Sequence, residues 1–281
     1  MYQGIVIVWL AWKRFNQHDA WALSSHISMT FLLALFPFLI AMTSLASFLG
    51  ASSLSDSAVS LVLESWPEQV AKPIAQEVYQ VLTVRRTDVL TISFLTSLYF
   101  ASSGVECLRI GLNRAYGAQE DRSWWWLRFC SIFIVILGVA ALLCFTFFII
   151  LGPALWASLI NYAPDLEKLS HIVALLRIGS VLFLLLGALF VVHVFVPAEW
   201  YSVRYIFPGI VITVLLWVIG GSGFGWYLEL FSRNYITTYG SLATAMMTLV
   251  FLYLSAALFL FGAEINGVLI DKNIRCQKTE L

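Results

Sequence analysis

Two acidic side chains stand out because each lies beside a long stretch without charged residues. Glu106 and Arg109 follow one such stretch, and Asn113 and Arg114 come directly after them. Residues spaced three and four apart lie on the same face of a helix. Glu106 and Arg109 therefore either pair with each other at a solvated helix end or help to line a polar cavity open to the cytoplasm.

Glu264 and Asn266 follow an uncharged run of 30 residues, from 234 to 263. A carboxylate in such surroundings needs water, a cation or a hydrogen-bond donor. Either Glu264 extends to the membrane interface, or it pairs with Arg109 or Arg114 across a helix contact. Because intramembrane ionisable residues often mark a substrate path, we predict a polar cluster on the cytoplasmic side that acts as a gate or admits a substrate. Its members are Glu106, Arg109, Asn113, Arg114, Glu264 and Asn266.

The overall composition indicates the solvent in which these residues lie. Of 281 residues, 60% are hydrophobic and 11% are charged, whereas soluble domains carry about 25% charged residues. The mean hydropathy is +0.87, so we expect membrane lipids to surround most of the chain. Lys and Arg together number 16, as do Asp and Glu. This balance gives no basic footprint for a nucleic acid, and we expect none as a partner.

The uncharged stretches predict an all-α fold, a polytopic membrane helix bundle with six transmembrane helices. Each stretch can hold one span of about 20 residues, and helices satisfy the backbone hydrogen bonds inside lipid. Alternation typical of a transmembrane barrel is absent from the sequence. The predicted spans, within a single membrane domain of residues 1–281, lie near 27–49, 89–111, 130–152, 174–196, 206–228 and 242–269.

The distribution of basic residues predicts the orientation of this bundle. With the N-terminus inside, ten of the sixteen Lys and Arg residues fall on the cytoplasmic side, in agreement with the positive-inside rule. Both termini would then be cytoplasmic, with residues 271–281 as a tail. Residues 1–18 and 56–84 are predicted to be amphipathic interfacial segments, on the inner and outer leaflets respectively.

Proline and glycine residues mark positions where the predicted helices could bend or pack closely. Small residues allow two helix backbones to approach each other, and a flexible hinge is the alternative interpretation. The final turn before the last helix is marked by an aromatic residue and a glycine. The candidates for hinges, close packing or turns are Pro37, Pro208, Gly209, Gly221, Gly225, Tyr239 and Gly240.

The sequence contains no clear motif for metal binding or covalent catalysis. The four cysteines form no C-x-x-C pair, and the four histidines are scattered without an H-E-x-x-H pattern. No histidine partner is evident for any serine, which disfavours intramembrane proteolysis. We therefore expect no enzyme, no cofactor and no metal.

Several segments together resemble the YihY/BrkB family of bacterial inner-membrane proteins, formerly labelled the ribonuclease BN family. The likeness covers nearly the whole chain and rests on the order and spacing of its segments. They are Ser24–Pro37, Leu112–Tyr116 followed by Arg122, Pro208-Gly209, Tyr239-Gly240 with Tyr253, and Gly262–Asn266. The resemblance implies a six-helix protein of the inner membrane and a role in moving lipid or envelope components, and it assigns no catalytic residue.

Three functions follow from these observations. The first is a transporter or flippase for a lipid-like substrate or envelope precursor, without an ATPase of its own because the sequence has no G-x-x-x-x-G-K-[ST] motif. The second is an envelope-assembly scaffold that transports nothing. The third, a ribonuclease, is disfavoured by the scattered histidines and the neutral charge. The sequence predicts no oligomeric state.

Overall fold

A computed structural model describes residues 2–48, 90–141, 170–239 and 242–279 of the chain. These residues form helices joined by turns, and no strand occurs among them, which confirms the all-α prediction. In chain order the helices are α1 (Tyr2–Gln17), α2 (Ala20–Phe48), α5 (Leu90–Tyr116), an unnumbered helix Trp124–Ala141, α7 (Ser170–Phe195), α8 (Val203–Tyr239) and α9 (Ala243–Thr279).

Each of the six predicted spans overlaps one of these helices, with α1 preceding the first. In the part of the chain that the structure describes, three segments are long and apolar enough to cross a membrane: Trp124–Ala141, Val203–Phe231 and Ala245–Lys272. Shorter apolar stretches, Ala20–Leu35 and Gly179–Phe195, lie in α2 and α7. Six membrane crossings therefore remain a prediction. The predicted outer segment 56–84 lies outside the described residues, and the predicted tail is helical to Thr279.

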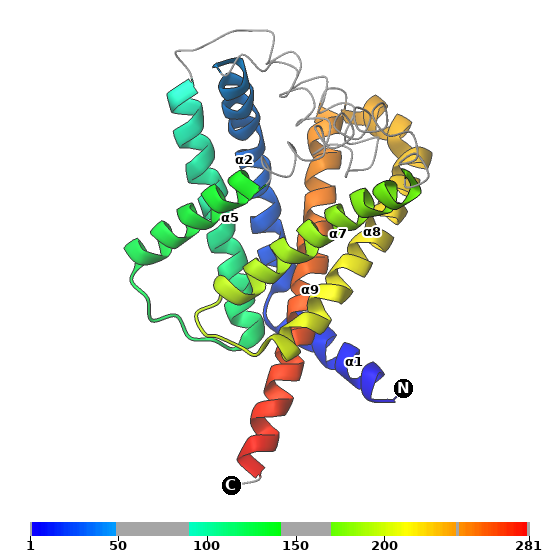
Figure 1. Ribbon diagram of the computed structural model, residues 1–281. Helices are drawn as coiled ribbons and strands as arrows, with labels where there is room; N and C mark the ends of the chain where they lie inside the picture. The colour runs from blue at the N-terminus through cyan, green and yellow to red at the C-terminus, as the bar shows by residue number, and fades with distance from the viewer. Residues whose placement is uncertain (1, 49–89, 142–169, 240–241, 280–281) are drawn as a thin grey trace.

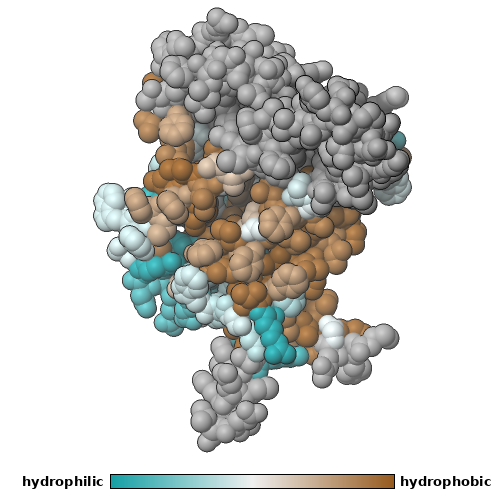
Figure 2. Space-filling view, in the orientation of Figure 1, coloured by the Kyte–Doolittle hydropathy of each residue, from teal (hydrophilic) through white to brown (hydrophobic). Residues whose placement is uncertain are grey.

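The outer surface of the bundle is apolar over a broad band. Figure 2 shows brown side chains across the middle of the molecule and teal ones gathered toward one end. Many large hydrophobic side chains of the described residues are exposed, such as Phe183, which is 79% exposed, and Ile219, which is 68% exposed. A soluble protein seldom exposes contiguous apolar surface of this extent, so lipid is the medium that suits this surface.

Helix α9 forms the centre of the bundle. It packs against α1, α2, α5 and α8, while α2 also packs along α5. The buried core draws on all of these helices through residues such as Phe15, Ile27, Leu112, Ile210 and Leu260. Both chain termini lie at the same end of the bundle (Figure 1). Residues 262–271 of α9 lie against α1, α5 and α8 at that end, and the last turns of α9 extend beyond the bundle (Figure 1).

Two glycines allow α8 and α9 to approach each other closely. A Cβ atom on Gly209 would clash with the Gly262 carbonyl oxygen, and one on Gly262 would clash with Thr213 Oγ1. Because both obstacles are close to or part of the opposing backbone, only glycine fits at this crossing. The packing interpretation thus describes Gly209 well, and α8 continues as a helix through Pro208.

Gly221, a further predicted packing position, lies in open space beside a more crowded glycine. A Cβ on Gly221 would meet no described atom within 4 Å, whereas one on Gly220 would lie 2.7 Å from Leu258 Cδ1. Close packing in this part of α8 therefore involves Gly220, and Gly221 has open space among the described residues. Gly225 also lies in α8, Pro37 lies within α2, Tyr239 ends α8, and Gly240 falls outside the described residues.

Candidate functional site

The turn that follows α5 directs the chain back onto its own helix. Gly117 adopts φ +71°, a conformation that glycine takes at little steric cost. The Gly117 amide donates to the Arg114 carbonyl and the Ala118 amide donates to the Asn113 carbonyl. These two bonds are the pattern of a Schellman motif, which ends a helix and reverses the chain. The reversal brings Glu120 beside the last turns of α5.

Glu120 is the centre of a group of polar residues that we name the Glu120 cluster: Arg109, Asn113, Glu120 and Arg122. Arg109 donates to Glu120 Oε2 over 2.7 Å, and Arg122 Nε donates to Oε1 over 2.7 Å. Asn113 Nδ2 donates to the same carboxylate over 3.1 Å. Hydrogen bonds from Arg122 lower the pKa of Glu120 to about 2 against the opposing effect of burial, and Arg109 adds to the lowering. Glu120 is therefore ionised at neutral pH.

Asn113 connects this cluster to the turn between α7 and α8. Its Oδ1 atom accepts a hydrogen bond from the Ala198 amide over 2.8 Å, while its Nδ2 atom binds Glu120. Arg122 also reaches the Val196 carbonyl over 3.4 Å. Both the oxygen and the nitrogen of the Asn113 side-chain amide thus have a hydrogen-bond partner. Asn113 therefore holds both the segment after α5 and the turn between α7 and α8 against the end of α5.

A second group, the Arg14 cluster, consists of Arg14, His18, Glu264 and Asp271. Glu264 is only 2% exposed. Its carboxylate accepts from Arg14 Nε over 3.2 Å and contacts His18 Nδ1 over 2.6 Å. Arg14 also pairs with Asp271 and donates to the Ala115 carbonyl. Because a buried charge is costly without partners, these contacts account for a carboxylate at this depth.

The geometry of the turn between α1 and α2 allows this cluster to form. Asp19 has φ +53°, a left-handed conformation that aspartate tolerates better than most residues. Gly267 of α9 lies where a Cβ would clash with the Ala115 carbonyl oxygen and approach Arg14. The absence of a side chain at Gly267 therefore leaves room for Arg14 to reach across α9 to the end of α5.

Asn266 joins three helices in a third, fully buried contact. Its Oδ1 atom accepts from the Gly209 amide over 2.7 Å, and its Nδ2 atom donates to the Tyr116 hydroxyl over 3.3 Å. Asn266 is 0% exposed. Buried amides with both ends paired fix the relative position of the elements they join. Asn266 thus ties α9 to α8 and to the end of α5.

The structure corrects the expected pairing of the charged residues. Glu106 pairs with Arg128 over 3.1 Å, and Arg109 pairs with Glu120, so the proposed Glu106 to Arg109 pair is wrong. The expected pairing of Glu264 with Arg109 or Arg114 is also wrong, because its carboxylate pairs with Arg14 and His18. The predicted residues do gather near the end of α5, but in separate groups.

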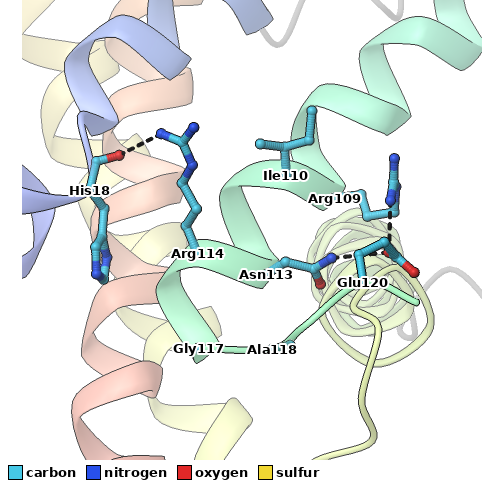
Figure 3. A pocket seen from close by; sticks show the side chains of 8 residues that line it. All are labelled: His18, Arg109, Ile110, Asn113, Arg114, Gly117, Ala118 and Glu120. Carbon is cyan, nitrogen blue, oxygen red and sulfur yellow. Dashed lines mark hydrogen bonds and ion pairs between the residues drawn. The ribbon is translucent and has the colours of Figure 1, made fainter. Parts of the chain in front are cut away.

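An open pocket lies between the Glu120 cluster and the turn after α1 (Figure 3). Its volume is about 420 Å³, and its lining residues are His18, Arg109, Ile110, Asn113, Arg114, Gly117, Ala118 and Glu120. Arg114 crosses one side of the pocket and donates to the His18 carbonyl over 3.1 Å. Three of the six predicted cluster members, Arg109, Asn113 and Arg114, line this pocket, and the other three do not.

Sequence reasoning missed most of the partner residues. Arg14 and His18 are about 250 positions from Glu264 in the sequence, and no local pattern connects them. Glu120 could have been found, because a lone glutamate in a loop with several arginines is a natural ion-pair partner. Arg128 binds Glu106, Ser103 Oγ and the Tyr99 carbonyl, and it fastens the helix Trp124–Ala141 to α5.

The described residues form an all-helical membrane protein with a polar pocket at one end. The chain belongs to the family described as Virulence factor BrkB, which it matches over residues 11–280. The resemblance to the YihY/BrkB family is thereby confirmed. No solved structure matches the chain.

Two curated relatives illustrate the range of this similarity. The ribonuclease-like protein YfkH of Bacillus subtilis is 28% identical over 257 residues, which cover 92% of each chain. A UPF0761 membrane protein of Tolumonas auensis is 25% identical over an alignment that covers 96% of this chain and 88% of the relative. Both alignments extend over nearly the full helical bundle.

Proposed function

We propose that this protein is a transporter or flippase of the bacterial inner membrane that moves a lipid-like substrate or envelope precursor. In this proposal it crosses the membrane six times, keeps both termini in the cytoplasm and uses no ATPase of its own. The pocket between the Glu120 cluster and His18 is the place where a polar headgroup enters from the cytoplasm. Binding and movement are driven by a gradient, by exchange or by a partner protein.

The observation that carries this proposal is the position of the pocket. A cavity of about 420 Å³ with charged side chains in its lining lies at the end of α5 (Figure 3), and hydrophilic side chains gather toward one end of an otherwise apolar surface (Figure 2). Binding sites are typically concave, with a few well-placed polar groups. A lipid has a polar headgroup and apolar chains, so a charged pocket next to an apolar exterior suits both parts of such a molecule.

The six-span arrangement draws support from the placement of the ends. Both termini lie at one end of the bundle, as an even number of crossings requires. Ten of the sixteen basic residues fall on that side in the predicted topology, and basic residues favour the cytoplasm. Fusion of a cytoplasmic reporter to either terminus should give activity, and activity of a periplasmic reporter at either terminus would contradict this orientation.

Neither an enzyme nor a scaffold is favoured by a specific contact. Among the described residues, no group of three or more His, Cys, Asp or Glu side chains is placed to hold a metal ion. The ribonuclease-like name belongs to the relative YfkH. A scaffold remains the alternative, and it differs from the transporter in one measurable respect, since it moves nothing.

Reconstitution into vesicles tests the proposal. Purified protein is inserted into liposomes that contain a fluorescent phospholipid, and a membrane-impermeant reductant reports how much of the label reaches the outer leaflet. We expect wild-type vesicles to lose nearly all fluorescence, and protein-free vesicles to lose about half. Equal loss in both preparations, with and without an imposed ion gradient and across headgroups of different charge, would refute lipid movement by this protein alone and favour the scaffold.

A further inference from the structure

We propose that the pocket binds a phosphate group, with Arg114 as its main ligand and Arg109 as a further positive charge in the wall. This inference rests on the proposed function, because it names the chemical class that the pocket of the transporter would receive. The phosphate could belong to a lipid headgroup or to a free phosphate ion, and the two sources share the chemistry that the pocket recognises. Basic pockets between membrane helices commonly bind phosphorylated headgroups.

The charge of the pocket lining is the first argument. Arg109 and Arg114 line the pocket together with a single carboxylate, that of Glu120. Glu120 is already bound to Arg122, which contacts it through both Nε and Nη2. The His18 ring, a further potential cation, is directed to Glu264. The lining therefore carries more positive than negative charge, which favours an anionic ligand.

Arg114 provides the second argument. Within the described part of the chain, Arg114 Nη1 donates to the neutral His18 carbonyl over 3.1 Å, and no carboxylate pairs with Arg114. The side chain is exposed toward the pocket that it lines. A guanidinium group has five N–H donors in a planar fork, so donors remain for another group. A phosphate oxygen matches that fork in both charge and geometry.

Arg109 adds a second positive charge to the wall of the pocket. Its Nη1 atom binds Glu120, while its Nε atom is buried without a hydrogen-bond partner among the described residues. Because a buried atom is not accessible to a ligand in the pocket, Arg109 favours an anion there through its charge and not through that donor.

The size of the pocket and its other groups fit the same ligand. A volume of about 420 Å³ exceeds that of a single water or small ion and leaves space for a phosphate joined to a further group. Ile110 adds an apolar wall and is 40% exposed. Arg109 and Arg114 lie five positions apart on α5 and approach different parts of the pocket, Arg109 beside Glu120 and Arg114 beside the His18 carbonyl (Figure 3). An anion bound by Arg114 would therefore face a wall that carries the charge of Arg109.

Binding measured on the full-length protein in non-ionic detergent tests this inference without any need for transport. Isothermal titration uses inorganic phosphate, dihexanoyl phosphatidate and hexanoate as probes. We expect the wild type to bind at least one phosphate-bearing probe more tightly than hexanoate. Because a hydrogen bond to a charged group contributes about 1.5–3 kcal/mol, Arg114→Gln should weaken that binding by roughly tenfold or more.

Three further variants separate the pocket from general effects. Arg114→Lys keeps the charge and should retain part of the affinity. Arg204→Gln removes an exposed cation that does not line the pocket, and it should bind like the wild type. Ile110→Trp fills the pocket without a charge change and should abolish binding, which tests the site even if an arginine variant unfolds.

Each outcome bears on the inference. If phosphate and phosphatidate bind alike, a free phosphate is sufficient, and if only phosphatidate binds, the ligand is a lipid headgroup. Failure of both probes to bind, equal binding of hexanoate, or equal losses in Arg114→Gln and Arg204→Gln would overturn the proposal. A protein that binds phosphate but moves no lipid in vesicles would overturn the proposed function alone. A protein that moves lipid but binds neither phosphate-bearing probe would overturn only this inference.

Discussion

Replacement of Glu264 by glutamine should destabilise the bundle through the Arg14 cluster. The carboxylate is 3% exposed and its partner Arg14 is 17% exposed, so this ion pair is largely shielded from water. Removal of one member of a buried pair costs about 3–5 kcal/mol, because the other charge is left uncompensated. Arg14 keeps Asp271 and the Ala115 carbonyl, so we expect the lower end of that range, about 3 kcal/mol.

The expected loss can be measured by thermal unfolding in detergent. In a domain of 150–250 residues, 1 kcal/mol shifts Tm by about 2–4 °C, so Glu264→Gln should lower Tm by about 6 °C or more. Retention of the monodisperse peak in size-exclusion chromatography after heating provides the readout. Lys13→Gln removes a neighbouring exposed cation of α1 and serves as the control, which we expect to change Tm by less than about 1 °C.

A double-mutant cycle tests whether the loss arises from the pair itself. Arg14→Gln and Glu264→Gln should each lower the free energy of unfolding. The loss in the double variant should be smaller than the sum of the two single losses by about 1 kcal/mol or more. Strictly additive losses would refute the reasoning, because they would mean that Arg14 and Glu264 act independently. A Tm for Glu264→Gln equal to that of the wild type would refute it as well.

Three further predictions concern other contacts of the bundle. Gly262→Ala should lower the free energy of unfolding by about 1–3 kcal/mol, because the added Cβ has no space against α8. Gly221→Ala should be neutral or stabilising, and thermal unfolding compares the Tm values of the two variants. Arg128→Gln should free the helix Trp124–Ala141 from α5 and increase protease cleavage there, and unchanged cleavage would contradict that contact. The Glu120 carboxyl has a folded-state pKa of about 2, lowered from an ordinary value of 4.5, so its stabilising effect is complete above about pH 4.5 and is lost as the pH falls toward 2. Wild-type Tm should thus fall more steeply than that of Glu120→Gln between pH 5 and 3, and parallel curves would contradict this.

The parts of the fold that follow from local composition were predictable. The charge-free runs within α8 and α9 are long enough that hydropathy alone identifies these helices as candidate spans. Helix α5 is harder, because it carries Glu106, Arg109 and Arg114 and is not among the helices apolar enough to cross by composition. Gly117 directly after α5 is a recognisable helix-ending glycine, and it could have indicated that Glu120 folds back.

The pairing of charges was not predictable in the same way. The sequence indicates that Glu264 needs a partner, but several cations lie at the same predicted depth, and the choice depends on how α1 packs against α9. That packing in turn depends on Gly267, where the missing side chain admits Arg14. Such tertiary contacts between residues about 250 positions apart leave no periodic pattern in the chain.

In the proposed function, the pocket at the end of α5 lies on the path of a moving substrate. A variant with its four cysteines replaced by alanine, and Ile110→Cys added, allows a bulky maleimide to be attached inside the pocket. In reconstituted vesicles, labelling should stop movement of the fluorescent phospholipid, while full labelling of Lys13→Cys should leave it unchanged. Movement at the unlabelled rate after complete modification of Ile110→Cys would contradict the account.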